Sequence, residues 1–366
     1  MMTIETIIAQ LEILAPPSLQ EGYDNAGLIT GNLSAACTGA IISLDATEEV
    51  VMEAVQKKCN LVISHHPIIF SGVKKITGSN YVQKAVIAAI KNDIALYAIH
   101  TNLDNVYHGV NKMIADKLGL INRKVLLPKN GVLKKLYVYV PGEHATQLRN
   151  ALFAAGAGNI GNYSECSFNS TGTGTFKGNK ETTPFFGAPG KLEETPEIKM
   201  EMLFPAYIEQ QVIAAMIANH PYEEVAYDII ALDNQYPAVG TGLAGELPEA
   251  LNEKEFLRLI QKAFEVPVVR HTTLLNRKVK KVALCGGAGS FLISNALAAK
   301  ADFFITADLK YHEFFDANGR MVIADIGHFE SEQFTINLLA GFLQEKFPTF
   351  AALKTAVKTN PVNYFL

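Results

Sequence analysis

The sequence predicts an α/β protein: a mostly parallel sheet with helices on both faces, plus an inserted ferredoxin-like α+β domain. Short apolar runs alternate with amphipathic helical patterns at both ends of the chain, and such βαβ alternation is typical of parallel sheets. Between these ends the pattern changes to a β-α-β unit, a hairpin and a second β-α-β unit, which matches a ferredoxin-like fold.

The N-terminal part begins with an amphipathic pattern, Met1–Leu14, which we interpret as a helix with Thr3 as its N-cap. Its acidic residues and its lack of a basic start argue against a signal peptide. No apolar run in the chain approaches the ~20 residues that cross a bilayer. The following elements are expected at Gly39–Asp45 (strand), Thr47–Asn60 (helix, capped by Thr47), Leu61–Ser64 (strand), Asn80–Asn92 (helix) and Ile94–His100 (strand).

The middle of the chain is predicted to be an inserted domain at residues 130–235, which leaves 1–129 and 236–366 as the α/β core. Turn-rich segments, Pro128–Gly131 and Asp233–Gly242, flank it, and Thr182–Pro196 is expected to be a loop. Its elements are expected at Leu136–Val140 (strand), Glu143–Ala155 (helix), Tyr163–Asn169 with Gly172–Gly178 (hairpin), Ile198–Leu203 (strand), Ala206–Asn219 (helix) and Val225–Leu232 (strand).

The C-terminal part returns to strand and helix alternation. Its elements are expected at Val279–Leu284 (strand), Phe291–Lys300 (helix), Phe303–Thr306 (strand), Leu309–Asn318 (helix), Met321–Asp325 (strand) and Ser331–Lys346 (helix).

Composition narrows the class of protein. With 49% hydrophobic and 19% charged residues, the chain has enough apolar side chains for a large core. A formal net charge of −4 argues against nucleic acid or an anionic membrane as the main partner. The four cysteines form no CxxC pair, so we interpret them as reduced thiols of a cytoplasmic protein.

Four polar clusters each follow directly on a predicted strand. Because ligands of open α/β sheets bind at the carboxyl ends of the strands, these clusters are expected to meet at one edge of one sheet. The clusters are His65-His66 after Leu61–Ser64, His100 to Asp104 after Ile94–Ile99, Asp308 with His312 and Glu313 after Phe303–Thr306, and His328 to Glu332 after Met321–Ala324.

Imidazole and carboxylate groups suit zinc, iron or manganese ions and need no thiolate. His328 and Glu332 are four residues apart, so they chelate one ion if a helix begins near His328. The adjacent side chains of His65 and His66 diverge and can serve two ions. Asp104 can bridge two metals, which gives the usual two-metal hydrolytic arrangement. We therefore predict that these five residues bind two divalent metal ions.

Each of these features also has a plainer interpretation. His65-His66-Pro67 can belong to a helix cap region, and Glu330 with Glu332 can form a solvated first helical turn. Joint placement of the candidates at one end of the sheet favours the metal site. A lone histidine more often fills the core or the surface, and we interpret five histidines in this way: His100, His108, His144, His220 and His271.

Two turns complete the set of candidates. Cys285–Ser290 follows a strand and opens a helix, so its backbone amides can cradle a phosphate, although it lacks P-loop spacing and is equally consistent with a tight turn. Asp24 and Asn25 lie in a polar turn that either faces the site or forms a simple Asx turn.

Six ordered motifs closely resemble the dinuclear-metal proteins known as GTP cyclohydrolase I type 2 homologs, or the Nif-three-like family. The likeness covers about residues 1–125 and 240–366, and the middle resembles the PII/CutA-like insert of longer members. The motifs are Tyr-Asp-Asn-Ala-Gly-Leu (23–28), Ile-Ser-His-His-Pro (63–67), His-Thr-Asn-Leu-Asp (100–104), Gly-Gly-Ala-Gly-Ser (286–290), Thr-Ala-Asp-Leu-Lys-Tyr-His (306–312) and Gly-His-Phe-Glu-Ser-Glu (327–332).

The resemblance implies that the family's metal ligands match His65, His66, Asp104, His328 and Glu332, that His312 lines the same cavity, and that the chain forms homohexamers. It leaves two classes of function open. One is a metal-dependent hydrolase of a small nucleotide-like or phosphorylated substrate, with His312 or Glu330 as proton shuttle. The other is a non-catalytic metal-binding regulatory or scaffold protein with a PII-like sensing domain.

Overall fold

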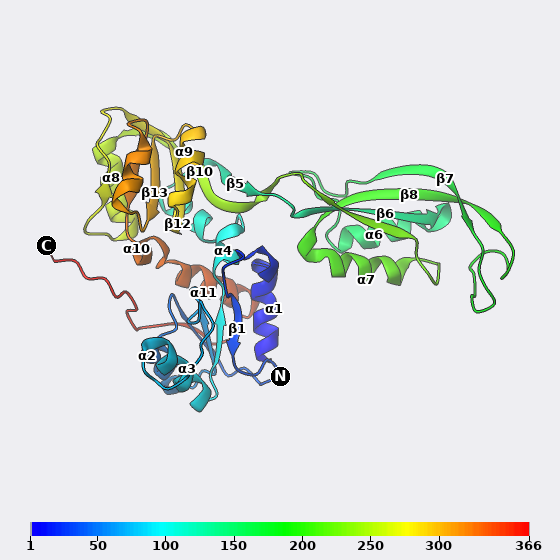
Figure 1. Cartoon of the computed structure of the whole chain (residues 1–366), viewed down its shortest axis with the longest axis horizontal. Coiled ribbons are helices and arrows are strands. Elements are labelled where there is room, and N and C mark those ends of the chain that lie inside the picture. The colour runs from blue at the N-terminus through cyan, green and yellow to red at the C-terminus, as the bar shows by residue number, and fades with distance from the viewer. Residues whose placement is uncertain (1, 366) are drawn as a thin grey trace. The chain divides into compact units, whose positions relative to one another are not determined.

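The chain divides into two compact units in a computed structural model that describes residues 2–365 (Figure 1). The first unit, here called the core unit, consists of Met1–Pro128 and Ala238–Leu366. The second unit, here called the insert, consists of Lys129–Pro237. Among the described residues, none of the helices combines the length and the apolar character that a bilayer span requires.

The N-terminal half of the core unit builds a five-stranded sheet in the order β1-β4-β3-β2-β15. Strands β15, β2, β3 and β4 are parallel, whereas the edge strand β1 is antiparallel to β4. Every residue of β2, β3 and β4 is buried, as expected for parallel strands covered on both faces. The strands are β1 (Gly27–Thr30), β2 (Ala40–Ser43), β3 (Leu61–Ser64), β4 (Ala95–Ala98) and β15 (Ala352–Lys354).

Helices cover both faces of this sheet because alternate strand residues point to opposite sides. Val62 and its neighbours on one face pack with α2 and α3, whereas Ile63 and its neighbours on the other face pack with α1. Thr3 caps α1 and Thr47 caps α2, as predicted. The helices of this half are α1 (Ile4–Leu14), α2 (Glu48–Gln56), α3 (Tyr81–Lys91), α4 (Thr101–Asn105) and α5 (Val110–Lys117), with a 3₁₀ turn at Pro17–Leu19.

The C-terminal half of the core unit builds a six-stranded sheet in the order β11-β14-β13-β12-β10-β5. Strands β12, β13 and β14 are parallel, and β10 and β11 are antiparallel to their neighbours β12 and β14. One apolar cluster joins both sheets, since it contains Ile63 as well as Phe303. The strands are β5 (Ile121–Lys129), β10 (Tyr236–Asn252), β11 (Arg270–His271), β12 (Lys278–Ala288), β13 (Phe303–Ala307) and β14 (Val322–Asp325).

The helices of the C-terminal half depart from the sequence prediction in three places, and the first is α8, for which no helix was predicted. The helix expected at Ser331–Lys346 is two helices, α10 and α11, and α10 begins at His328. The segment expected as a helix at Leu309–Asn318 is a 3₁₀ helix, Tyr311–Ala317. The α-helices are α8 (Glu253–Phe264), α9 (Ile293–Ala298), α10 (His328–Glu332) and α11 (Thr335–Lys346), and a 3₁₀ turn at Ser290–Leu292 precedes α9.

The prediction of an α/β fold is confirmed, but the prediction of a single, mostly parallel sheet is wrong. The core unit contains two mixed sheets, because antiparallel strands flank each parallel centre. Strands β10 and β11 carry weak strand signals in the sequence. Strand β11 has only two residues, and β10 contains Pro237, Pro248 and three glycines, so its first residues resemble a turn-rich linker.

The insert is a four-stranded antiparallel sheet in the order β7-β8-β6-β9, covered by two helices, with the βαββαβ order of a ferredoxin-like unit. The hairpin differs from the prediction. Its first arm is the single strand β7, and its second arm β8 begins inside the segment expected to be a loop. The elements are β6 (Leu133–Pro141), α6 (Ala145–Ala154), β7 (Phe168–Phe176), β8 (Glu193–Pro205), α7 (Glu209–Asn219) and β9 (Tyr227–Leu232), with 3₁₀ turns at Gly142–His144 and Ala206–Ile208.

Candidate metal centre

The strand ends of both core sheets place His65, His66 and His328 next to one another. His65 and His66 follow directly on β3, and His328 opens α10 just after β14. The prediction that all clusters share one sheet is therefore wrong, because the two ends of the chain build separate sheets. Their carboxyl ends supply the site together.

The Nδ1 atom of each histidine is held by an acceptor. His65 Nδ1 donates to the carbonyl of Ile99 at 2.8 Å, a bond that fixes its tautomer because a carbonyl cannot donate. His66 Nδ1 lies 2.8 Å from Asp45 Oδ1, and His328 Nδ1 lies 2.6 Å from Asp308 Oδ2. Metal-binding histidines are commonly oriented by a carbonyl or carboxylate on the second nitrogen. Because each Nδ1 atom is engaged, the Nε2 atoms of the three histidines are the ones available as metal ligands.

The Nε2 atoms converge on Glu332, which lies one helical turn after His328. Glu332 Oε2 is 3.0 Å from His66 Nε2 and 3.1 Å from His328 Nε2, and these two nitrogens are 3.2 Å apart. If both histidines donate through Nδ1 and are neutral, their Nε2 lone pairs face each other. A cation between them removes this repulsion.

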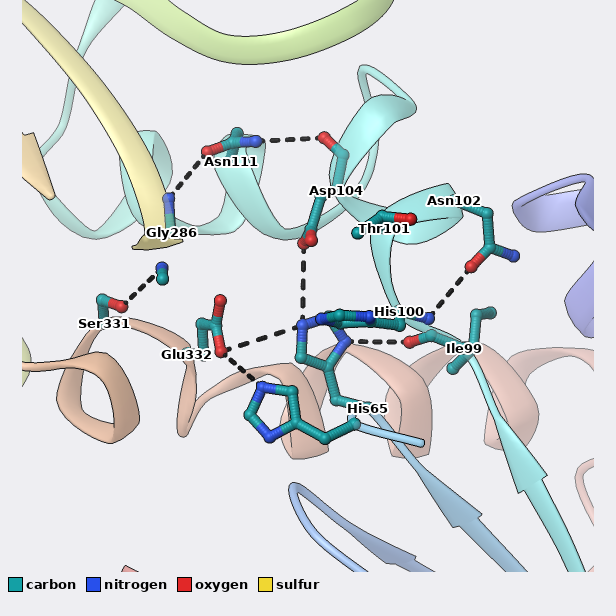
Figure 2. Close-up of polar contacts among 12 residues, drawn as sticks. His65, Ile99, His100, Thr101, Asn102, Asp104, Asn111, Gly286, Ser331 and Glu332 are labelled. Atoms are coloured by element: carbon teal, nitrogen blue, oxygen red, sulfur yellow. Dashed lines mark hydrogen bonds and ion pairs between the residues drawn. The ribbon is translucent and has the colours of Figure 1, made fainter. Parts of the chain in front are cut away.

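The other half of the group is His65 with Asp104, whose side chains Figure 2 shows pointing toward each other. His65 Nε2 lies 3.6 Å from Asp104 Oδ1 and 3.8 Å from Glu332 Oε2. Both His65 Nε2 and Asp104 Oδ1 are buried without a hydrogen-bond partner. Buried polar atoms are nearly always satisfied, so two unsatisfied atoms at one point indicate a place for a ligand. The donor set therefore fits metal ions.

Electrostatics within the group favour positive charge. Burial opposes the protonation of His66 and His328, but the carboxylates beside them raise the pKa to about 9 for His66 and to about 11 for His328. Burial, together with the nearby Glu332, raises the pKa of Asp104 to about 7. The surrounding histidines overcome burial at Glu332 and hold its pKa well below the usual range. A site that attracts protons in this way also attracts metal cations.

The glycine-rich end of β12 serves the packing of this group. A Cβ atom at Gly287, which has a φ of +59°, would overlap Oε1 of Glu332. The amides of Gly286 and Gly287 donate to Asn111 Oδ1 and Ser331 Oγ, both at 3.0 Å (Figure 2). The amides of Gly286 and Gly287, which belong to β12, are therefore committed to internal acceptors, and this argues against the phosphate-cradle interpretation.

Two residues that the sequence analysis did not assign to the site lie beside it. His100 was interpreted as structural, yet its ring lies 5.2 Å from that of His65 and 5.4 Å from that of His66. His100 Nδ1 is 2.8 Å from Asp24 Oδ1. Burial opposes ionisation of Asp24, but hydrogen bonds from His100 and Thr101 lower its pKa to about 2. The sequence carries two signals for this pair: the polar turn around Asp24, and the position of His100 at the start of a polar cluster that follows a strand.

The two predicted proton shuttles lie in different surroundings. Glu330 is buried, accepts a hydrogen bond from Asn360 at 3.0 Å, and lines a cavity of about 630 Å³ together with His66 and His328. His312 is exposed, and its ring packs against Tyr311 and Phe315. His312 is not among the residues that line this cavity.

Three groups of side chains place their ligand atoms within 4.8 Å of one another, and each could hold a metal ion. Fold and donor set together define the class: an α/β protein with a histidine and carboxylate group suited to metal ions. The groups are His65, Asp104 and Glu332; His66, His328 and Glu332; and His65, His66 and His100.

The chain belongs to the DUF34/NIF3 (NGG1p interacting factor 3) family, whose model matches residues 2–361. It is 42% identical to a GTP cyclohydrolase 1 type 2 homolog of Halalkalibacterium halodurans, with 88% of each chain covered. The identity is 40% to the protein of the same name from Bacillus subtilis, over 89% of this chain and 88% of the relative. A crystal structure of a Bacillus cereus protein related to NIF3 superposes with a TM-score of 0.87 at 38% identity, covering 100% of this chain and 99% of that one. The resemblance inferred from the six motifs is thus confirmed.

Proposed function

We propose that two divalent metal ions are held by five residues, here called the metal group: His65, His66, Asp104, His328 and Glu332. We expect the ions to be zinc, iron or manganese. The observation that supports this most directly is the pair of unsatisfied buried atoms, His65 Nε2 and Asp104 Oδ1. The carboxylates of Asp45, Asp104, Asp308 and Glu332 also supply negative charge around the group, which divalent ions would offset.

We propose further that the protein is a cytoplasmic hydrolase of a small nucleotide-like or phosphorylated substrate. Two divalent ions bound there would supply Lewis acidity, which polarises the bond under attack and makes a water more acidic. The cavity of about 630 Å³ beside His66 and His328 has the volume of a small-molecule site. Glu330 in its wall is the better placed of the two predicted proton shuttles.

The second predicted shuttle, His312, fits this proposal only in an assembly. Tyr311 and Phe315, which flank it, are 73% and 65% exposed, and subunit contacts commonly cover exposed aromatic side chains of this kind. We propose that the homohexamer implied by the family resemblance buries this surface. Light scattering of the purified chain tests it: a monomer at all concentrations would remove His312 from the proposed machinery.

Metal analysis and a substrate screen test the proposal in sequence. His65→Ala, Asp104→Ala and Glu332→Ala are each expected to lower bound metal in elemental analysis. His271→Ala, which changes an exposed histidine outside the group, is the matched control. Wild-type metal content in all three variants would end the metal assignment.

A screen of nucleotides and phosphoesters with the metal-loaded chain then decides between the two functions. Metal-dependent turnover of any of them supports the hydrolase. A metal-bound protein without turnover supports the second candidate, a regulatory or scaffold protein whose insert acts as a PII-like sensing domain. The compact βαββαβ unit favours that candidate because it is a unit of its own and contains none of the proposed metal ligands.

A further inference from the structure

The insert contains a cavity that the metal site does not explain. It has a volume of about 450 Å³ and lies at the end of β7, between the long β7–β8 loop and the segment after α7. Three aromatic rings line it, those of Phe176, Phe185 and Tyr222. Tyr222 is the central ring, because its centroid lies 6.4 Å from that of Phe176 and 6.1 Å from that of Phe185.

Tyr222 is tilted against both of its neighbours in the cavity wall. The interplanar angle is 53° with Phe176 and 45° with Phe185. A small group in the cavity is therefore flanked by rings of different orientation. Ring faces carry negative partial charge and attract cations within about 6 Å of the centroid.

Carboxylates reinforce this preference, since Glu197, Glu223 and Glu224 also line the cavity. Within the described residues, no lysine or arginine forms an ion pair with any of the three. Lys177 is the only cationic residue of the lining and is exposed, so the lining keeps a negative balance. A phosphate or a carboxylic acid is disfavoured there.

The position of the central carboxylate is fixed by its neighbours. Tyr222 donates its hydroxyl hydrogen to Glu197 Oε1 at 2.8 Å. A Cβ atom at Gly174 would overlap Glu197 Oε2, so the carboxylate lies across a strand position that only glycine leaves open. The hydroxyl bond holds ring and carboxylate together, so both face a cation in the cavity from fixed positions.

The loop that carries Phe185 is also anchored. Its neck is closed by the amide of Gly190, which donates to the carbonyl of Gly178 at 2.8 Å. The amide of Thr183 donates to Glu223 Oε1 at 2.8 Å, which ties the loop to the segment after α7. The cavity is thus bounded by connected parts of the insert.

We propose that this cavity binds a small organic cation, a quaternary or otherwise alkylated ammonium group, through the rings of Phe176, Phe185 and Tyr222 and the carboxylate of Glu197. This proposal is independent of the metal group, because every residue involved belongs to the insert.

Ligand-observed NMR with the full-length chain tests it, using choline and its uncharged carbon analogue 3,3-dimethylbutan-1-ol as the two probes. Choline is expected to bind with a dissociation constant at or below about 10 mM, and the neutral analogue at least about tenfold more weakly. Equal binding of both probes, or no binding of choline at that concentration, would overturn the proposal.

Two variants and a control locate the binding. Tyr222→Leu removes the central ring and is expected to abolish choline binding. Glu197→Gln keeps the shape of the side chain and is expected to weaken binding about tenfold, so it decides the question if the first variant fails to fold. Tyr163→Leu removes a tyrosine of the insert that is 76% exposed and is not part of the lining, and it should bind as wild type. Unchanged binding in folded Glu197→Gln would contradict the assigned role of the carboxylate.

Discussion

The core unit and the insert use buried polar side chains in opposite ways. Nearly all the buried polar and charged residues of the described chain lie in the core unit, and only Thr195 and His220 lie in the insert. In the core unit several of them contact the proposed metal ligands or the residues next to them. Asn111, for example, donates to the backbone carbonyl of Asp104 and accepts from the amide of Gly286. The insert is held by apolar packing around residues such as Leu148 and Met202.

Together with the proposed metal binding, this difference predicts that the stability of the core unit depends on bound metal and that the stability of the insert does not. Buried polar atoms without a partner are costly, and the core unit has two of them at one place, His65 Nε2 and Asp104 Oδ1. The insert reaches its fold without such a group. Perturbations should therefore separate the two units.

Removal of bound metal is expected to have the largest effect. At a free metal concentration about 1,000 times the dissociation constant, binding stabilises a fold by about 4 kcal/mol. Calorimetry with and without a chelator should show the transition of the core unit falling sharply while that of the insert stays in place. A chelator that shifts both transitions equally, or neither, would contradict the predicted difference between the core unit and the insert.

A substitution that opens a void in the hydrophobic core of the insert should destabilise the insert and leave the core unit unchanged. Leu148 is fully buried, so Leu148→Ala should cost about 3 kcal/mol of the insert's free energy of unfolding. The metal content should remain that of the wild type, as measured by elemental analysis. Loss of metal from this variant, while it remains folded, would show that the two units are coupled.

Substitution of a residue that contacts a proposed metal ligand, without being a ligand itself, should have a smaller effect. Asp45 accepts from His66 Nδ1, and Asp45→Ala should weaken metal binding about 10- to 100-fold through loss of that orientation. Competition with a chromogenic chelator measures the affinity. Asp116→Ala is the matched control, because Asp116 pairs with Lys112 and Arg123 at the surface of the same unit. Equal affinities of the two variants would argue against the role given to Asp45.

The smallest expected effect is a pH dependence of the stability of the insert, which comes from His220. Burial lowers its pKa, although the Tyr139 carbonyl and Glu197 favour the charged form, and His144 adds to the lowering. Its Nε2 donates to Tyr139 while its Nδ1 accepts from the amide of Tyr222, so the folded insert requires the neutral ring. The unfolded chain takes up a proton at about pH 6.5, above the folded pKa.

The stability of the insert should therefore fall as the pH drops below about 6.5. Thermal unfolding at a series of pH values measures this, and His220→Gln should flatten the profile. An unchanged slope in that variant would assign the pH dependence to other groups.

Local signals made much of the fold predictable. Buried apolar strands such as Leu61–Ser64 and helix caps such as Thr47 can be recognised from a few consecutive residues. The division of the core into two mixed sheets was not predictable in this way. Strand direction at an edge depends on distant pairing, and β10 carries the prolines and glycines of a turn.

The same distinction applies to the site. His65, His66, His100 and His328 each follow a predicted strand, but the contact of His100 with Asp24 joins positions that are 76 residues apart. No spacing rule connects two such positions. Likewise, the pairing of Asp45 with His66 and of Asp308 with His328 arises only when the strand ends meet.

The place where the chain leaves and re-enters the core unit has a consequence for how such proteins can be remodelled. Strands β5 and β10 are neighbours in one sheet, and a Cβ atom at Gly240 would overlap the backbone of Leu127 and Pro128. Exit and return are therefore adjacent, and a short connection can bridge them. Domains inserted between such adjacent points can be gained, exchanged or discarded as whole modules without redesign of the host.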